Sequence, residues 1–171
     1  MNLLIVDDEY LVVEEVVTVT DWELLGITEI YSATNAVSAV RILNEKKIDI
    51  MICDIEMPQT DGLELSKKAK ENFPDLEIVM LTSHAEFNYV RNALRYGCYD
   101  YLLKPVMEDD IIKVMKNLVT KIERERHQAQ LQEEGIVWNQ LKPVWKEKYW
   151  EEMLRGLRDD PNRESEEYEE K

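Results

Sequence analysis

The chain has 171 residues, of which 44% are hydrophobic and 33% are charged. This length allows one well-buried domain with an appendage and excludes two domains of typical size. Its 36 acidic and 21 basic side chains give a formal net charge of −15. Such a charge repels nucleic acid and anionic membranes, so we expect these residues to contact neither.

The sequence also predicts the compartment of the protein. No apolar run approaches the roughly 20 residues that span a bilayer, and the acids Asp7 and Asp8 come too early for a secretory signal. We therefore expect a cytoplasmic protein without a membrane partner. Cys53 and Cys98 stand in apolar surroundings without metal-ligand spacing, which predicts reduced core residues.

The first part of the chain alternates short apolar runs with helical patterns. The run Leu3–Val6 predicts a strand, and the apolar spacing over Tyr10–Val19 predicts the helix that follows it. After a turn, Thr28–Ser32 predicts a second strand. Asn35 is the predicted N-cap of a second helix, which continues to about Leu43.

The same alternation continues through the next 80 residues. The remaining elements are predicted, in chain order, as a strand at Ile48–Asp54, a helix at Leu63–Phe73, a strand at Glu77–Thr82, a helix at Glu86–Tyr96, a strand at Asp100–Lys104 and a long helix opened by Asp109 and Asp110. Gly97 follows the fourth helix and is the residue type that most easily adopts a left-handed conformation there. In the last helix, Ile112, Met115, Val119 and Ile122 repeat at helical spacing.

Five strands that each precede a helix predict a parallel sheet with helices on both faces, because each crossover passes over the sheet with the same hand. We predict an α/β fold of the doubly wound, flavodoxin-like (βα)5 class, with strand order 2-1-3-4-5 and a C-terminal helical extension. The sequence contains no Gly-x-Gly-x-x-Gly motif, which argues against a dinucleotide-binding fold.

Acidic residues follow two strands that this order makes neighbours. Asp7 and Asp8 follow the first strand, and Asp54 ends the third. Ligands of open α/β sheets bind outside the carboxyl ends of the strands, so these carboxylates should converge in one pocket. Their repulsion predicts a cation, and Mg²⁺ prefers such oxygen ligands. Asp8 and Asp54 would coordinate it directly, Asp7 directly or through water, and Glu56 through its backbone carbonyl.

Two further polar side chains are predicted at the same edge. Thr82 ends the fourth strand and Lys104 ends the fifth. Taken singly, an Asp after a strand is usually a loop cap, such a Lys a solvated charge and such a Thr a strand residue with a bonded hydroxyl. Their joint placement favours a site in which a cation, an ammonium and a hydroxyl neutralise a phosphoryl group on Asp54.

Four motifs in this order resemble the receiver domain of bacterial two-component response regulators. They are Val6–Glu9, Asp54–Gly62, Leu81–Ser83 and Tyr99–Pro105. The resemblance implies that Asp54 takes a phosphoryl group from a sensor histidine kinase or from acetyl phosphate in a Mg²⁺-dependent reaction. It also implies that Lys104 pairs with the phosphoryl oxygens and that the Lys104–Pro105 bond is cis.

The resemblance further implies a switch. Thr82 and Tyr101 correspond to the family's switch pair, in which the hydroxyl moves onto the phosphate and the ring turns inward. The output face would then be 86–101, and this fourth-helix to fifth-strand face is one candidate surface for a homodimer. Glu56 and His84 occupy positions that influence the lifetime of the phosphorylated state.

We divide the chain into a receiver domain at 1–124, a helical linker at 125–157 and an acidic end at 158–171, which is expected to be disordered. The linker holds three of the four Trp residues. These aromatic rings should pack on the receiver, on a second copy, or on residues absent from this chain. The segment Leu141–Leu157 is similar to the linker of YesN-type response regulators, which carry an AraC-type DNA-binding domain. DNA would be bound only through a domain that this chain lacks.

Two alternatives remain beside a receiver that controls a transcriptional domain. The first is a stand-alone receiver that acts as a phosphorelay or protein-interaction module. The second is a hydrolase with an aspartyl-phosphate intermediate, because Glu56 lies two residues past Asp54, where such enzymes carry a general acid/base. The receiver interpretation makes the protein a signalling phosphoacceptor, not an enzyme with turnover.

Overall fold

A computed structural model describes residues 1–58, 61–83 and 97–132. His84 and the predicted helix at 86–96 lie outside the described residues, as does the segment from 133 to 171. Met1–Ile122 form one compact unit, and the side-chain clusters discussed below lie in this unit.

All five predicted strands are present, and the helices lie close to their predicted positions. In chain order the elements are β1 (Asn2–Val6), α1 (Tyr10–Thr18), the short 3-10 helix η1 (Glu23–Leu25), β2 (Glu29–Ala33), α2 (Ala36–Glu45), β3 (Ile50–Asp54), α3 (Gly62–Asn72), β4 (Glu77–Thr82) and β5 (Asp100–Leu103). A further helix covers residues 108–132 and is called here the C-terminal helix. β3 begins two residues later than predicted; just before it, the Asp49 carboxylate accepts a hydrogen bond from Asn2 N–H at 2.6 Å, and Asp49 N–H donates to Asn2 O at 3.0 Å.

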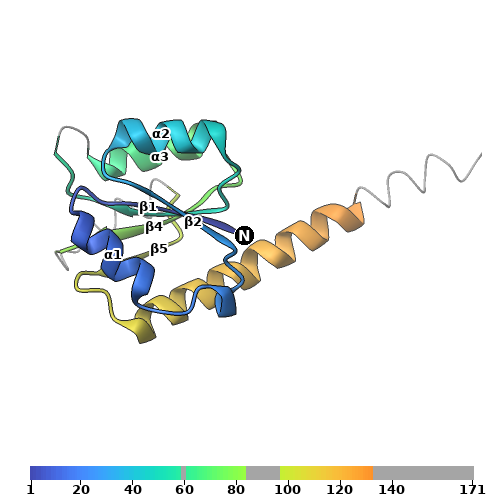
Figure 1. Cartoon of the computed structure of the whole chain (residues 1–171). Helices are drawn as coiled ribbons and strands as arrows, with labels where there is room; N and C mark the ends of the chain where they lie inside the picture. The colour runs from blue at the N-terminus through green and yellow to red at the C-terminus, as the bar shows by residue number, and fades with distance from the viewer. Residues whose placement is uncertain (59–60, 84–96, 133–171) are drawn as a thin grey trace, which may run out of the picture. The chain divides into compact units, whose positions relative to one another are not determined.

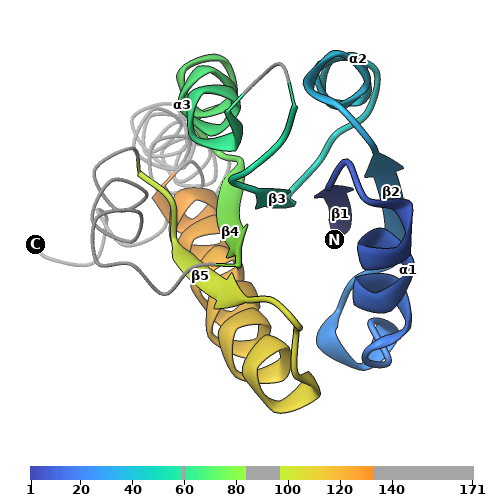
Figure 2. The same cartoon turned by 90° about the vertical axis from the view of Figure 1, so that its left-hand side faces the viewer.

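The five strands form one parallel sheet in the order β2-β1-β3-β4-β5 (Figure 2). This confirms the flavodoxin-like topology. In the register, Val6 pairs with Cys53, and Asp54 pairs with Leu81. The carboxyl ends of β1, β3 and β4 therefore meet at one edge of the sheet, here called the carboxyl edge.

The helices cover the two faces of the sheet (Figure 1). Alternate residues of β1 enter separate core clusters: Leu3 and Ile5 pack with α1 and the C-terminal helix, whereas Leu4 and Val6 pack with α2 and α3. The β-strand period of two produces this division, since successive side chains point to opposite faces. Full burial of both faces explains why the central strands consist of continuous apolar runs.

The predicted apolar repeat of the C-terminal helix differs from the structure in one detail. In the C-terminal helix, Ile111 is fully buried, whereas Ile112 is only partly buried. Adjacent residues of an α-helix lie about 100° apart around its axis, so the face that meets the core includes Ile111 and leaves Ile112 at its margin. In α2, Ala39 and Leu43 are buried, but Val40 is 43% exposed at the margin of the stripe.

Local signals in the sequence account for several element ends. The Asn35 side chain accepts a hydrogen bond from Ser38 N–H at 2.8 Å, which confirms the predicted N-cap of α2. Trp22 is buried, and its indole N–H donates to the carbonyls of Val16 and Val17 at 3.2 and 3.0 Å. Both carbonyls belong to the last turn of α1, where backbone carbonyls have no hydrogen-bond partner within the helix. Gly97 has φ +81°, the left-handed conformation predicted for it.

Both cysteines are buried free thiols, as predicted. Burial raises the pKa of the Cys53 thiol, and it raises that of Cys98 to about 11. Among the described residues, no helix has the length and hydropathy needed to cross a bilayer.

Candidate functional site

Three carboxylates gather at the carboxyl edge. Asp7, Asp8 and Asp54 each offer an oxygen within 4.8 Å of the others. Asp7 and Asp54 are 0% and 3% exposed, whereas Asp8 faces solvent. The structure thus brings together the three acids that follow β1 and β3 in the sequence, and one of them offers a route to water.

The backbone at the end of β1 explains why Asp7 and Asp8 differ in burial. Asp7 N–H donates to Ala33 O of β2 at 3.1 Å, so Asp7 still follows the sheet. Its Oδ1 accepts a hydrogen bond from Glu9 N–H at 2.9 Å, which closes a tight turn. The turn directs Asp7 into the protein and leaves Asp8 outside.

Lys104 joins two of these carboxylates. Its Nζ lies 2.6 Å from Asp7 Oδ2 and 3.1 Å from Asp54 Oδ1, and its side chain is 13% exposed. The backbone N–H of Lys104 donates to Thr82 O at 2.9 Å, which holds the ends of β4 and β5 together. The Lys104–Pro105 peptide bond is cis, as the resemblance implied.

Burial and charge act against each other on these groups. Burial raises the pKa of the Asp54 carboxyl; the hydrogen bond and charge of Lys104 and the backbone N–H of Glu56 oppose this rise, and the Asp7 charge adds to it. Burial lowers the pKa of Lys104, but its pairs with Asp7 and Asp54 outweigh burial and leave that pKa raised. Ionised Asp54 is thus costly in this pocket, and added positive charge would lower the cost.

The donor set fits a divalent cation such as Mg²⁺. All three acids offer hard carboxylate oxygens, and two oxygens of an octahedral Mg²⁺ shell lie roughly 3 to 4 Å apart, so small rotations would bring the three to one ion. Asp7 Oδ2 is buried and lies 2.6 Å from Lys104 Nζ. A carboxylate oxygen has more than one lone pair, so this buried oxygen could bind a cation as well.

Gly62 allows the loop after β3 to close over Asp54. Its N–H donates to Ile55 O at 2.9 Å. A Cβ at this position would lie 1.8 Å from Asp54 O, so no other residue fits without moving the backbone that carries the carboxylate. The sequence marks this glycine only as a loop residue beside Asp61, whose side chain caps α3 by accepting Leu63 N–H at 2.8 Å.

The other predicted site residues are placed as follows. Thr82 is buried at the end of β4, beside Lys104 of the next strand end. Tyr101 is half-buried against the core cluster on the α2 and α3 face. The Glu56 side chain is exposed. His84 lies outside the described residues.

The sequence matches the family model of the response regulator receiver domain over residues 3–116. It is 34% identical over 124 residues to YesN of Bacillus subtilis, described as an uncharacterized transcriptional regulatory protein; the match covers 72% of this chain and 34% of YesN. It is 32% identical over 127 residues to the response regulator SaeR of Staphylococcus aureus, covering 74% of this chain and 54% of SaeR. The chain thus spans less than two thirds of these relatives.

Solved structures give the same result. The REC domain of AraT, a response regulator from Geobacillus stearothermophilus, superposes with a TM-score of 0.68 at 30% identity and covers 73% of this chain and 97% of that one. NtrX from Brucella abortus gives a TM-score of 0.69 at 28% identity, over 76% of this chain and 29% of NtrX. With the carboxylates, the lysine and the strand order in place, these matches show that the chain belongs to the receiver domain family of two-component response regulators.

Proposed function

We propose that Asp54 accepts a phosphoryl group from a sensor histidine kinase, or from a small donor such as acetyl phosphate, in a Mg²⁺-dependent reaction. The observation that carries this proposal is the position of Asp54 between Lys104 Nζ, at 3.1 Å, and the oxygens of Asp7 and Asp8. A carboxylate in that position has positive charge on one side and a candidate cation site on the other. Both would stabilise charge on a transferring phosphoryl group.

The transfer is a substitution at phosphorus. An oxygen of Asp54 attacks the phosphorus atom, and the new O–P bond forms as the N–P bond of a phosphohistidine, or the O–P bond of acetyl phosphate, breaks. The imidazole or acetate leaves with the electron pair. Lys104 neutralises phosphoryl oxygens, and Asp8, Asp54, Asp7 and the Glu56 carbonyl would hold the cation. Bound Mg²⁺ supplies a Lewis acid that lowers the negative charge on the phosphoryl oxygens.

We further propose that Thr82 and Tyr101 change position when Asp54 is phosphorylated. The Thr82 hydroxyl moves onto the phosphoryl group, and the Tyr101 ring turns from its half-buried position toward the vacated space. This is supported by the hydrogen bond between Lys104 N–H and Thr82 O, because it couples the two strand ends that carry the pair. Glu56 and His84 would tune the lifetime of the acyl phosphate, and the segment 86–101 would present the result to partners.

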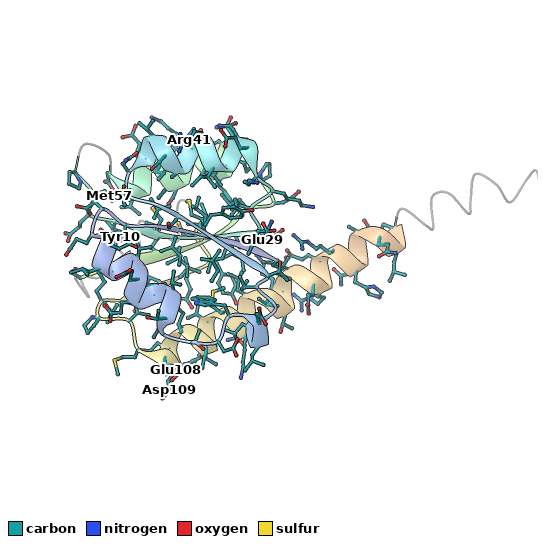
Figure 3. The ribbon with its side chains drawn as sticks, viewed as in Figure 1. Tyr10, Glu29, Arg41, Met57, Glu108 and Asp109 are labelled. Atoms are coloured by element: carbon teal, nitrogen blue, oxygen red, sulfur yellow. The ribbon has the colours of Figure 1, made fainter. Side chains whose placement is uncertain are left out.

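Exposed apolar side chains beside the acids support docking of a kinase. Tyr10 and Leu11 follow the turn of Asp7 and Asp8 and are 61% and 76% exposed, and Met107 follows the Lys104–Pro105 bond and is 61% exposed. Figure 3 places Tyr10 at the end of the sheet that also holds Met57 of the Asp54 loop, and Glu29 at the opposite end. Exposed apolar side chains that gather at one end of a domain are typical of a protein docking surface.

The output is proposed from the relatives. YesN is named as a transcriptional regulatory protein and is longer than this chain. We propose a receiver at 1–124, a linker at 125–157 and a disordered end at 158–171, which together control a DNA-binding domain outside this chain. We also propose a cytoplasmic location and a homodimer through the fourth-helix to fifth-strand face or the C-terminal helices. The stand-alone receiver is the alternative, and the natural length of the protein decides between the two.

The cation dependence tests the proposed chemistry. The 171-residue chain is incubated with acetyl phosphate across a Mg²⁺ series and with EDTA, and the phosphorylated fraction is read by intact mass. We expect no labelling in EDTA, and Asp8→Asn should need at least about tenfold more Mg²⁺ for half-maximal labelling, because it loses one charged ligand. The exposed Asp75 serves as a matched control, and Asp75→Asn should behave as the wild type. Equal labelling in EDTA, or an unchanged Mg²⁺ requirement in Asp8→Asn, would refute the proposal.

A further inference from the structure

A second charged cluster lies at the opposite edge of the sheet, where β4 begins. The Glu77 side chain is only 10% exposed, and its Oε1 lies 3.1 Å from Lys70 Nζ and 3.0 Å from Lys121 Nζ. Lys70 belongs to α3 and Lys121 to the C-terminal helix, which cover opposite faces of the sheet. One carboxylate oxygen of Glu77 therefore pairs with an ammonium group from each face of the sheet.

The lysines make further contacts that fix their positions. Lys121 Nζ lies 5.4 Å from the centroid of the Tyr99 ring, within cation–π range, and Tyr99 N–H donates to Ile78 O at 2.7 Å. Lys70 Nζ donates to Leu76 O at 2.7 Å. Tyr99 is the residue before β5, the strand that carries Tyr101 and leads to Lys104. The cluster thus joins β4, the start of β5 and both covering helices.

Lys121 lies beside the last buried residue of the C-terminal helix within the described part of the chain. Ile122 is the last buried residue of the C-terminal helix within the described residues, and 123–132 are exposed throughout. Lys121 thus belongs to the last turn of this helix that packs on the core. Apolar contacts from Val119 and Ile122 end there, and residues 123–132 beyond them are exposed and mostly polar.

We propose that Glu77 is a positioning residue that fastens this final buried turn to β4 and β5 through Lys121. The Lys121 ammonium interacts with the Glu77 carboxylate and the Tyr99 ring together, so its loss removes polar contacts of the helix with both strands. Lys70 shares the same carboxylate oxygen but holds α3 instead. Substitutions of the two lysines are therefore matched. Each removes one ammonium group from Glu77 Oε1, and only Lys121 belongs to the C-terminal helix.

Hydrogen–deuterium exchange of the 171-residue chain tests the proposal. In Lys121→Met, amides of residues 117–126 should exchange about fivefold faster than in the wild type, the size expected for one partly exposed ion pair with a cation–π contact. Lys70→Met should leave this peptide unchanged, since Glu77 keeps Lys121. Lys121→Arg should restore slow exchange, because guanidinium also pairs with carboxylate and ring. Labelling by acetyl phosphate should remain equal in all variants, which separates the proposal from the proposed chemistry at Asp54.

Two outcomes would overturn the proposal. Exchange over 117–126 that is unchanged in Lys121→Met would show that apolar packing alone holds the helix, and an equal increase in Lys70→Met would show a general loss of stability. If Lys121→Met fails to fold, Tyr99→Leu removes the cation–π contact, keeps an apolar side chain against the core, and should give a smaller increase in the same peptide. An unchanged peptide in that variant would count against the proposal as well.

Discussion

An Asp54→Asn protein is expected to gain no phosphoryl group when it is incubated with Mg²⁺ and acetyl phosphate. The amide has nearly the shape of the carboxylate but lacks the anionic oxygen that attacks phosphorus. The loss should therefore be complete, although Lys104 and Asp7, which lie 2.6 Å apart, remain to hold the pocket. Intact mass of the wild-type and variant proteins measures the difference.

The control for this experiment is another acid on the surface. Asp75→Asn changes the same functional group at an exposed position and should be labelled as the wild type is. If Asp54→Asn were still labelled, fragmentation of the labelled protein would place the phosphoryl group on a different residue. That result would remove Asp54 as the acceptor.

Lys104→Met is expected to slow labelling by acetyl phosphate about 100-fold, the range measured when a charge-stabilising group is removed from a reacting oxyanion. Its ammonium contacts both Asp7 and Asp54. Without it, the fully buried Asp7 loses the ammonium group that lies 2.6 Å from its Oδ2, and the pKa of Asp54, which Lys104 lowers, should rise further. Both changes oppose a charged acceptor at neutral pH.

The rate of mass gain at saturating Mg²⁺ measures this effect, and circular dichroism confirms that the variant is folded. Lys68→Met is the matched control, because Lys68 also pairs with a carboxylate, Glu64 at 2.8 Å, but both side chains are more than half exposed. It should label at the wild-type rate. A Lys104→Met protein that labels as fast as Lys68→Met would show that the lysine does not act on the phosphoryl group.

The fold could be predicted because the central strands are short apolar runs that end at a polar residue. Ile50–Asp54 and Glu77–Thr82 are buried along their whole length, and this requires two covering layers and a parallel sheet. The strand order then places Asp7, Asp8 and Asp54 at one edge, as observed. Periodicity and topology therefore suffice to find these carboxylates.

The direct contact between Lys104 and Asp7 could not be read from the sequence. The order of strands brings both residues to the carboxyl edge, but the 2.6 Å separation depends on the turn after β1 and on the path of the chain after β5. The sequence indicated a lysine for phosphoryl oxygens. In the structure the same ammonium neutralises the acids themselves.

The Glu77 cluster was also beyond sequence analysis. Lys70, Glu77 and Lys121 come from three elements, and no local spacing joins Glu77 to a helix that begins about 30 residues later. Gly62 is a third case, because a backbone approach of this kind leaves only the identity of the residue as a signal. Contacts between distant segments, and not local patterns, determine all three features.

The central claim is that Asp8, Asp54 and Lys104 serve one cation and one phosphoryl group. A crystal structure with Mg²⁺ and beryllofluoride, a mimic of the phosphoryl group, tests it most directly. We predict Mg²⁺ at about 2.0 to 2.1 Å from oxygens of Asp8 and Asp54, with beryllium bonded to an oxygen of Asp54 and Lys104 Nζ beside a fluoride. A Mg²⁺ ion bound away from these carboxylates, or beryllofluoride on another residue, would contradict the account.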